Sequence, residues 1–276
     1  MSEVKYLSVV MSTYNEEKYI RDSVESVLNQ TYPYFELIIV NDGSTDSTAD
    51  ILKTFNDSRI RIFDKENSGL PDSLNQGIKM ARYDWIARMD GDDIAEPTRF
   101  EKQIEAINDK VGVIGGQFYV IDSFGGLMSE EVSNKPLSSF GCKKSILLGM
   151  SPFAHPSVIF RKELIEKWGG YDTNFTAAQD LELWSRLAPS TKMKNLSDSV
   201  LKYRKHNNTI TNKRYELQMK LTFLGYLKYV LKIRKPLSKV EFQKLDSYFE
   251  KNGLLEKNNF YFCHSLVKQT IHTFWQ

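Results

Sequence analysis

The sequence has little cysteine, no long hydrophobic run and almost no net charge. Its 276 residues contain only two cysteines, Cys142 and Cys263, and no Cys/His cluster with the spacing of zinc ligands. We therefore expect neither a disulfide framework nor structural zinc, and both thiols should be small buried hydrophobes. No window reaches the roughly 18 uncharged apolar residues that a membrane-spanning helix needs.

The charge balance excludes simple polyanion binding. Lys and Arg total 37 and Asp and Glu total 35, which gives a formal net charge of +2. A protein that wraps nucleic acid is usually far more basic, so we expect no nucleic-acid partner. The hydrophobic fraction of 41% is enough for a sizeable core. The first residues lack the basic and apolar segments of a signal peptide, so we expect a cytoplasmic protein.

The near-neutral total hides an uneven distribution of charge. Residues 213–276 contain twelve basic and five acidic residues, a local net charge of +7, and residues 1–212 carry −5. We therefore predict a main domain at 1–212 and a basic helical C-terminal segment at 213–276. A basic helix with an aromatic face can lie on an anionic membrane surface. One expectation is therefore that 213–276 contacts the inner face of the membrane. The alternatives are packing on the main domain or on a second subunit, which would give a homodimer.

The first half of the chain alternates between strand-like and helix-like segments. Short apolar runs predict strands at 6–12, 35–40, 60–63, 85–89 and 111–121. Helical spacing or capping residues predict helices at 16–30, 44–55, 69–81 and 97–108. Later segments predict helices at 137–148 and 180–188 and a strand at 157–160, with irregular structure across 122–176. This rhythm predicts an α/β fold with a mostly parallel sheet and helices on both of its faces.

Polar residues follow each of the first four predicted strands. These segments are residues 13–16, 41–46, 66–69 and 90–93. The carboxyl ends of parallel strands share one edge of a sheet, where ligands bind. One such segment is ordinary turn chemistry, but four converging on one edge predict a binding site.

The segment after the fourth strand crowds three carboxylates into four residues. Asp90, Asp92 and Asp93 should repel one another and raise each other's pKa unless a cation is present. Mn²⁺ or Mg²⁺ takes oxygen ligands of this kind together with substrate phosphates. The alternative is a solvated acidic loop that precedes the helix starting near Pro97.

The order of these motifs resembles family 2 glycosyltransferases, which use nucleotide sugars and have the GT-A fold. The resemblance covers roughly residues 5–210. It rests on STYNE at 12–16, VNDGSTD at 40–46, NSG at 67–69 and DGDD at 90–93. It continues through His155-Pro156, GGYD at 169–172, Gln179-Asp180 and YRKH at 203–206. Each motif is weak alone, but their order and spacing are specific.

The resemblance implies a UDP-sugar donor and assigns residues to its pocket. Those that would contact the nucleotide or the diphosphate are Thr13, Tyr14, Glu16, Asp42, Asn67, Gly69, Asn75, Asp90 and Arg204. Asp42 would accept a hydrogen bond from the uracil imide. Asp92 would be the main ligand of Mn²⁺ or Mg²⁺, with Asp90 and His206 beside it. For Arg204 and His206 the alternative is an ordinary surface charge.

The resemblance also implies the reaction. Asp180 matches the general base of an inverting transfer, which removes a proton from the hydroxyl of a glycan or lipid-linked acceptor. The family often has Glu before this position, where this chain has Gln179. The alternative for Asp180 is an aspartate that caps the N-terminus of its predicted helix. We expect Trp184 to be core, and His155 to be either structural or a wall of the site.

Two other functions compete with glycosyl transfer. A nucleotidyltransferase that makes sugar nucleotides typically has a glycine-rich basic loop after its first strand. The corresponding loop here, residues 13–17, has no glycine and two acidic residues. A non-catalytic sugar-nucleotide-binding module would have no need for Asp180 or for the crowded carboxylates of 90–93.

Overall fold

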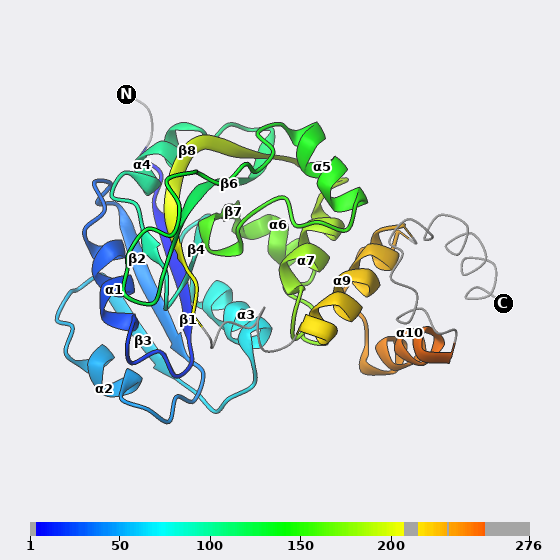
Figure 1. Ribbon diagram of the computed structural model, residues 1–276, viewed down its shortest axis with the longest axis horizontal. Coiled ribbons are helices and arrows are strands. Elements are labelled where there is room, and N and C mark those ends of the chain that lie inside the picture. The colour runs from blue at the N-terminus through cyan, green and yellow to red at the C-terminus, as the bar shows by residue number, and fades with distance from the viewer. Residues whose placement is uncertain (1–3, 207–214, 231, 252–276) are drawn as a thin grey trace.

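In the computed structural model, which describes residues 4–206, 215–230 and 232–251, eight strands form one sheet (Figure 1). Their order across the sheet is β3-β2-β1-β4-β7-β6-β8-β5. The strands are β1 (Leu7–Thr13), β2 (Phe35–Asn41), β3 (Ile60–Asp64), β4 (Trp85–Asp90), β5 (Ile94–Ala95), β6 (Val111–Ile121), β7 (Ile159–Arg161) and β8 (Lys192–Arg204).

The sheet joins a parallel half to a mixed half. Strands β3, β2, β1 and β4 pair in parallel, so their carboxyl ends lie at one edge. Strand β7 is antiparallel to both β4 and β6, whereas β6 and β8 are parallel and β5 is antiparallel to β8. The predicted α/β class is confirmed, and the sheet is parallel from β3 to β4 and mixed beyond β4.

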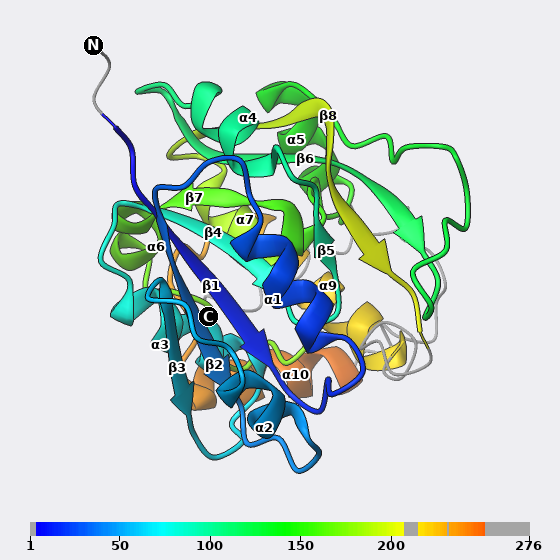
Figure 2. The ribbon, with the colours of Figure 1, turned by 90° about the vertical axis from the view of Figure 1, so that its left-hand side faces the viewer.

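Helices cover both faces because the central strands are apolar on both sides. On β1, Val9 belongs to one buried cluster and Val10 to the other, as expected for alternating side chains. One face is covered by α1 (Ile20–Leu28), α2 (Thr48–Lys53) and α4 (Arg99–Glu105). The other is covered by α3 (Leu70–Met80), α5 (Ser139–Leu147), α6 (Lys162–Lys167) and α7 (Gln179–Leu187). Figure 2 shows α1 lying across the face of β1.

Some elements differ from the sequence predictions. Helix α2 begins at Thr48 rather than residue 44, because the preceding residues bond to the segment after β1. The backbone N–H of Asn15 donates to Ser44 Oγ, and that of Thr45 donates to Asn15 Oδ1. The short 3₁₀ helix at His155–Ser157, helix α6 and strands β5 and β8 were not predicted. The predicted helices and strands elsewhere are confirmed with shifted ends.

The described part of the C-terminal segment is helical, as predicted, and packs on the main domain. Its helices are α9 (Tyr215–Val230) and α10 (Lys239–Lys251), at the right of Figure 1. Leu221, Leu224 and Leu227 of α9 form a buried cluster with Phe175 and Ala178, just before α7. This is the packing alternative rather than a free basic helix. Whether 213–276 is a separate domain, contacts a membrane or forms a homodimer stays a prediction.

A buried ionic cluster also joins α9 to α7. Lys228 of α9 is fully buried, and its Nζ donates to Asp172 Oδ2 at 2.9 Å and to Glu182 of α7. Arg186 binds both oxygens of Glu182, at 2.8 and 2.7 Å. Two carboxylates therefore face two cations, and no local pattern in the sequence predicts this pairing.

Two further expectations concern the thiols and the membrane. Cys142 is buried in the core, as predicted, whereas Cys263 lies outside the described residues. Among the residues described, no helix has both the length and the apolar character that crossing a bilayer requires.

Candidate active site

The three carboxylates after β4 form a compact acidic loop. In Asp90, Asp92 and Asp93, the possible ligand oxygens all lie within 4.8 Å of one another. A Cβ at Gly91 would overlap Glu16 Oε2 and lie 3.1 Å from Ile20 Cδ1. The glycine therefore lets the loop pack closely against the segment after β1.

Glu16 adds a fourth carboxylate to this loop. Thr13 Oγ1 donates a hydrogen bond of 2.7 Å to Glu16 Oε2 and holds that carboxyl in place. Burial, and then the nearby charge of Asp92, raise the pKa of Glu16 well above its ordinary value. The structure therefore brings Thr13 and Glu16 to the acidic loop, as the sequence predicted.

Arg88 partly compensates the acidic loop. Its buried guanidinium forms an ion pair with Asp90. Burial nevertheless raises the pKa of Asp90 to about 6, against the opposing effect of Arg88 and with a further contribution from Asp92. The charge of Asp180 contributes in the same direction, so Asp180 lies close enough to act on this loop.

Asp93 is the most enclosed member of the loop. Its Oδ1 accepts from the backbone N–H of Arg204 at 2.7 Å, whereas its buried Oδ2 has no hydrogen-bond partner among the described residues. Burial raises the pKa of Asp93 well above its ordinary value, and the charges of Asp92 and Asp90 add to the effect. An all-oxygen set with excess negative charge and an unsatisfied oxygen fits a hard divalent cation such as Mn²⁺ or Mg²⁺.

The two residues predicted from the YRKH motif both reach the loop. Arg204 is buried rather than on the surface, and its Nε donates to the backbone oxygen of Asp92 at 2.7 Å. It also lies over the ring of Tyr19, 4.8 Å from the centroid. His206 Nε2 lies 2.9 Å from Asp92 Oδ2. The surface-charge alternative is therefore wrong for Arg204, and the metal role of His206 stays a prediction.

Asp42 organises the loop that precedes α3. Its two oxygens accept from the backbone N–H groups of Ser68 and Gly69, each at 2.9 Å, and Oδ1 also binds Lys65 Nζ. The Asn67 amide donates to the backbone oxygen of Asp42 at 2.8 Å. The contact of Asp42 with a base stays a prediction, and Lys65 was missed because its role depends on this fold.

The remaining residues predicted for the nucleotide pocket divide into two kinds. Tyr14 is exposed at the end of β1, and Gly69 precedes α3 with a φ of 95° that favours glycine. Asn75 is already occupied: its amide donates to Tyr171 O at 2.9 Å and accepts from Tyr171 N at 2.7 Å. These contacts tie α3 to the segment before α7, and a ribose contact for Asn75 stays a prediction.

Asp180 is the second residue of α7. The cap position belongs to Ala178, whose φ of 53° is left-handed, so the alternative of Asp180 as an N-cap is wrong. Ser151 Oγ donates to Asp180 Oδ2 at 2.7 Å. Lys135 Nζ in turn donates to the backbone oxygen of Ser151 at 3.2 Å. The sequence analysis missed Ser151 and Lys135, because both come from the irregular stretch and reach Asp180 only through the fold.

His155 and Trp184 have structural surroundings. His155 Nε2 lies 2.7 Å from the hydroxyl of Tyr171. Burial, and then the charge of Arg88, lower the pKa of His155 well below its ordinary value, so its ring is neutral at pH 7. Trp184 is fully buried and packs edge-to-face against Phe153, which confirms that it belongs to the core.

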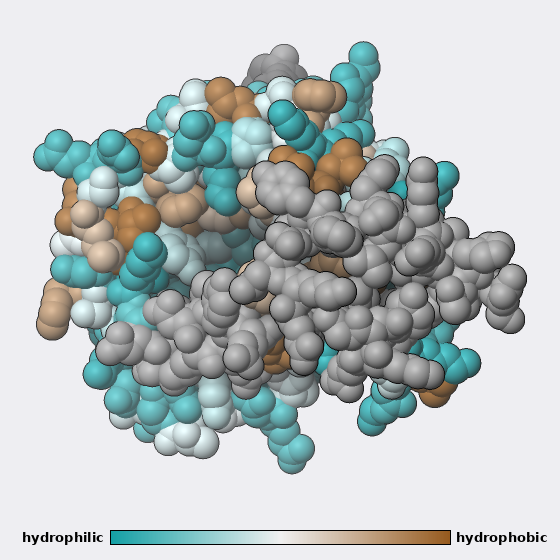
Figure 3. All heavy atoms as spheres, turned by 45° about the vertical axis from the view of Figure 1, so that its right-hand side comes forward, coloured by the Kyte–Doolittle hydropathy of each residue, from teal (hydrophilic) through white to brown (hydrophobic). Residues whose placement is uncertain are grey.

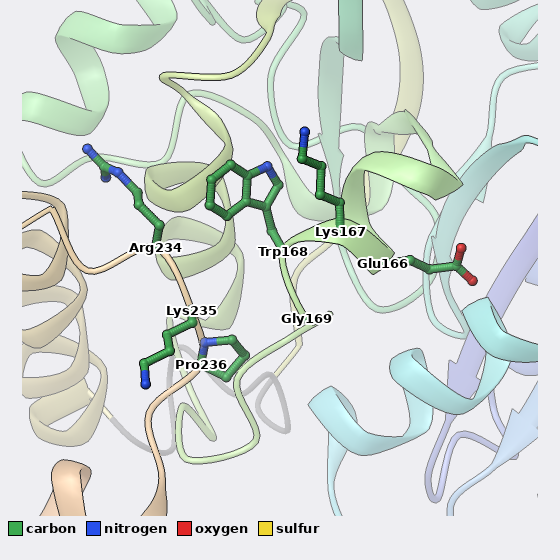
Figure 4. A pocket seen from close by; sticks show the side chains of 7 residues that line it. All are labelled: Glu166, Lys167, Trp168, Gly169, Arg234, Lys235 and Pro236. Atoms are coloured by element: carbon green, nitrogen blue, oxygen red, sulfur yellow. The ribbon is translucent and has the colours of Figure 1, made fainter.

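The surface has a hollow as well as a separate pocket. Figure 3 shows a recess with a hydrophilic floor beside the atoms drawn in grey. A pocket of about 380 Å³ lies elsewhere, between the end of α6 and the connection from α9 to α10 (Figure 4). Trp168 and Arg234 line it, and Pro236 lies so close to Gly169 that a Cβ there would be 2.8 Å from the proline ring. None of its lining residues belongs to the site. We therefore regard this pocket as a gap where the C-terminal segment packs against the main domain.

Known proteins match most of this chain. Residues 8–169 match the model of glycosyl transferase family 2. The O-antigen biosynthesis glycosyltransferase WbnJ of Escherichia coli is 34% identical over 210 residues, which cover 74% of this chain and 81% of that protein. The putative glycosyltransferase EpsE of Bacillus subtilis is 30% identical over 229 residues, which cover 80% of each chain.

Solved structures share the fold at low sequence identity. Residues 1–349 of Staphylococcus aureus TarS in complex with UDP-GlcNAc align with a TM-score of 0.66 at 20% identity, covering 92% of this chain and 75% of that one. The mannosyltransferase PcManGT of Pyrobaculum calidifontis, in complex with GDP-Man and Mn²⁺, aligns with a TM-score of 0.62 at 17% identity. That match covers 91% of this chain and 70% of PcManGT.

Proposed function

The chain belongs to glycosyl transferase family 2, and from that premise we propose that it is an inverting enzyme which transfers a sugar from a UDP-sugar to a hydroxyl acceptor. The observation that carries this proposal is the juxtaposition of the acidic loop and Asp180. The loop has excess negative charge suited to a cation on a diphosphate, and Asp180 is close enough to raise the pKa of Asp90. One site thus has a place for the leaving group and a carboxylate beside it.

The acidic loop would act on the leaving group. Asp92, with Asp90 and His206, would hold Mn²⁺ or Mg²⁺, which when bound neutralises the negative charge of the departing diphosphate. Arg88 fixes Asp90 through its ion pair, and Arg204 holds the backbone of Asp92. Both arginines are buried and so pre-organise the loop before the substrate arrives.

Asp180 would act on the acceptor as the general base. Ser151 occupies Oδ2 of Asp180, which leaves Oδ1 available for the proton of an attacking hydroxyl. The attack on the face opposite the leaving group would invert the anomeric carbon, and the proton would move from the hydroxyl to the carboxylate.

We propose UDP as the nucleotide on the basis of the motif at Asp42. Tyr14, exposed beside the acidic loop, would stack on the base, and the loop that Asp42 holds would face the base and ribose. TarS is described with UDP-GlcNAc and PcManGT with GDP-Man, so the fold itself accepts either nucleotide. The acceptor would be a glycan or a lipid-linked sugar at the cytoplasmic side of the membrane, in line with the role of WbnJ in O-antigen biosynthesis.

A donor panel tests the proposal. The full chain is incubated with UDP-, GDP- and dTDP-sugars and Mn²⁺, and the release of nucleoside diphosphate is measured. We expect turnover with a UDP-sugar and a loss of about 1,000-fold or more in Asp180→Asn, with donor binding retained. Asp109→Asn, an exposed aspartate outside the site, is the control. Turnover in Asp180→Asn equal to wild type would contradict the assignment of the base.

A further inference from the structure

Five of the large hydrophobic side chains that are exposed among the described residues lie on or beside α5. Phe140 is 79% exposed, and Leu147 and Leu148 are each more than half exposed. Leu137 before the helix and Met150 after it are exposed to a similar extent. Brown patches of this kind stand out on the upper part of the surface in Figure 3. An exposed apolar patch of several large side chains is typical of an interaction site.

Helix α5 is apolar on both sides. Cys142 and Ile146 point into the core and are fully buried. Phe140 and Leu147 lie on the opposite side, since residues seven apart on a helix share a face. A surface helix normally turns its apolar face to the core and its polar face to water, whereas among the described residues the outer face of α5 exposes Phe140 and Leu147 beside its two lysines.

Along the sequence, the charges in the segment that contains α5 have one sign. No Asp or Glu occurs between Glu131 and Glu163, and this stretch contains five basic residues. Two of them, Lys143 and Lys144, belong to α5 itself. Lysines beside exposed Phe and Leu are typical of helices that lie in the interface of an anionic bilayer.

We propose that the outer face of α5, with Leu137 and Met150 at its ends, docks on an anionic lipid bilayer. The apolar side chains enter the headgroup region, and Lys143 and Lys144 face the anionic lipids. This surface differs from the predicted one at 213–276. Leu221, Leu224, Leu227 and Lys228 of α9 are buried against the main domain, whereas the α5 face is exposed in the part of the chain that the structure describes.

The position of α5 connects this surface to the site. Ser151, the residue after Met150, donates to Asp180 Oδ2. Docking through α5 would therefore place the Asp180 side of the site close to the lipid surface, where a lipid-linked acceptor would lie. This last point rests on the proposed function, whereas the docking itself does not.

Vesicle flotation of the full chain tests the docking. Vesicles of phosphatidylcholine alone are compared with vesicles that also contain phosphatidylglycerol. We expect binding only to the anionic vesicles, and a loss of about tenfold or more in Phe140→Ser/Leu148→Ser and in Lys143→Ser/Lys144→Ser. The matched control is Lys239→Ser/Val240→Ser, which removes a lysine and an exposed valine from α10. Thermal unfolding shows that each variant is folded.

Three results would overturn the proposal. These are no binding to anionic vesicles, unchanged binding of the α5 variants, or loss of binding in the α10 control alone. A wild-type dimer in solution that the α5 variants convert to a monomer would assign the face to a second copy instead. The proposed function is judged separately. Asp180→Asn should lose transfer and still bind vesicles, and Phe140→Ser/Leu148→Ser should still turn over a water-soluble acceptor.

Discussion

The protein contains a fully buried charge cluster and a partly exposed one, which differ in how well their charges are compensated. Between α7 and α9, the carboxylates of Asp172 and Glu182 face Lys228 and Arg186. Lys228 also lowers the pKa of Asp172, against the effect of burial. Every member of this cluster therefore has an opposite charge in contact with it.

The acidic loop has the opposite character. Three aspartates and Glu16 share one region, and among the described residues Arg88 forms its ion pair with Asp90. The pKa values of Asp90, Asp93 and Glu16 are all raised, because burial and mutual repulsion disfavour their charged forms. The compensated cluster serves the fold, and the uncompensated one is suited to a ligand that brings positive charge.

The largest expected effect is on activity at the acidic loop. Asp92→Asn should reduce transfer by about 1,000-fold or more, because the cation that would bind the diphosphate loses its main carboxylate ligand. Its melting temperature should stay the same or rise, since repulsion inside the loop decreases. Steady-state kinetics and calorimetry measure both quantities. If Asp92→Asn melted at a lower temperature than wild type and kept its activity, Asp92 would be a stabilising residue rather than a functional one.

The matching change in the other cluster should act on stability. Lys228→Met leaves Asp172 and Glu182 buried with one cation fewer, which should lower the free energy of unfolding by about 3 kcal/mol or more. Urea unfolding gives the value, and Lys244→Met, on the exposed surface of α10, is the control. A loss below about 1 kcal/mol would mean that the cluster does not hold α9 to the main domain.

A smaller effect is expected from His155, whose buried ring feels the positive charge of Arg88. Its folded pKa lies below its unfolded pKa of about 6.5, so the unfolded state takes up the proton first as the pH falls. Stability should therefore decrease below pH 6.5, by up to about 1.4 kcal/mol per pH unit from this group. His155→Gln should flatten this slope in denaturant titrations between pH 7 and 5. An unchanged slope would show that His155 is protonated in the folded protein.

The smallest effect should come from Ser151. Ser151→Ala removes one hydrogen bond to Asp180, worth about 1 kcal/mol, and should lower kcat about fivefold with little change in KM. Ser129→Ala, on the exposed surface, is the control for the assay. If Ser151→Ala lost activity only in proportion to the protein that is unfolded in the assay, Ser151 would stabilise the fold and have no part in positioning Asp180.

The sequence predicted the first half of the chain better than the second. Strands β1 to β4 are short apolar runs followed by polar turns, so local pattern is enough to place them and the acidic loop. Strand β8 escaped prediction because it is rich in Lys and Ser and forms by pairing with β6, some 80 residues away. Lys228 reaches Asp172 and Glu182 across 56 and 46 residues. Such long-range pairings leave no local signal.

The same distinction explains the site. The motifs identified Asp92, Asp180 and Arg204, and the structure brings all three to one region. In the structure Arg204 binds the backbone of the acidic loop and Asn75 binds the backbone of Tyr171, because buried side chains satisfy their hydrogen bonds within the protein. Pattern alone identifies a polar residue near a site, but its partners follow only from the packing.

Calorimetric titration of UDP into the protein, with and without Mn²⁺, tests the central claim most directly. The excess negative charge of the acidic loop should oppose a bare diphosphate, so binding should be at least about tenfold tighter with Mn²⁺. Asp92→Asn should abolish that difference, and Asp180→Asn should keep it. UDP that binds equally well without a divalent ion, or equally well to Asp92→Asn, would contradict the account.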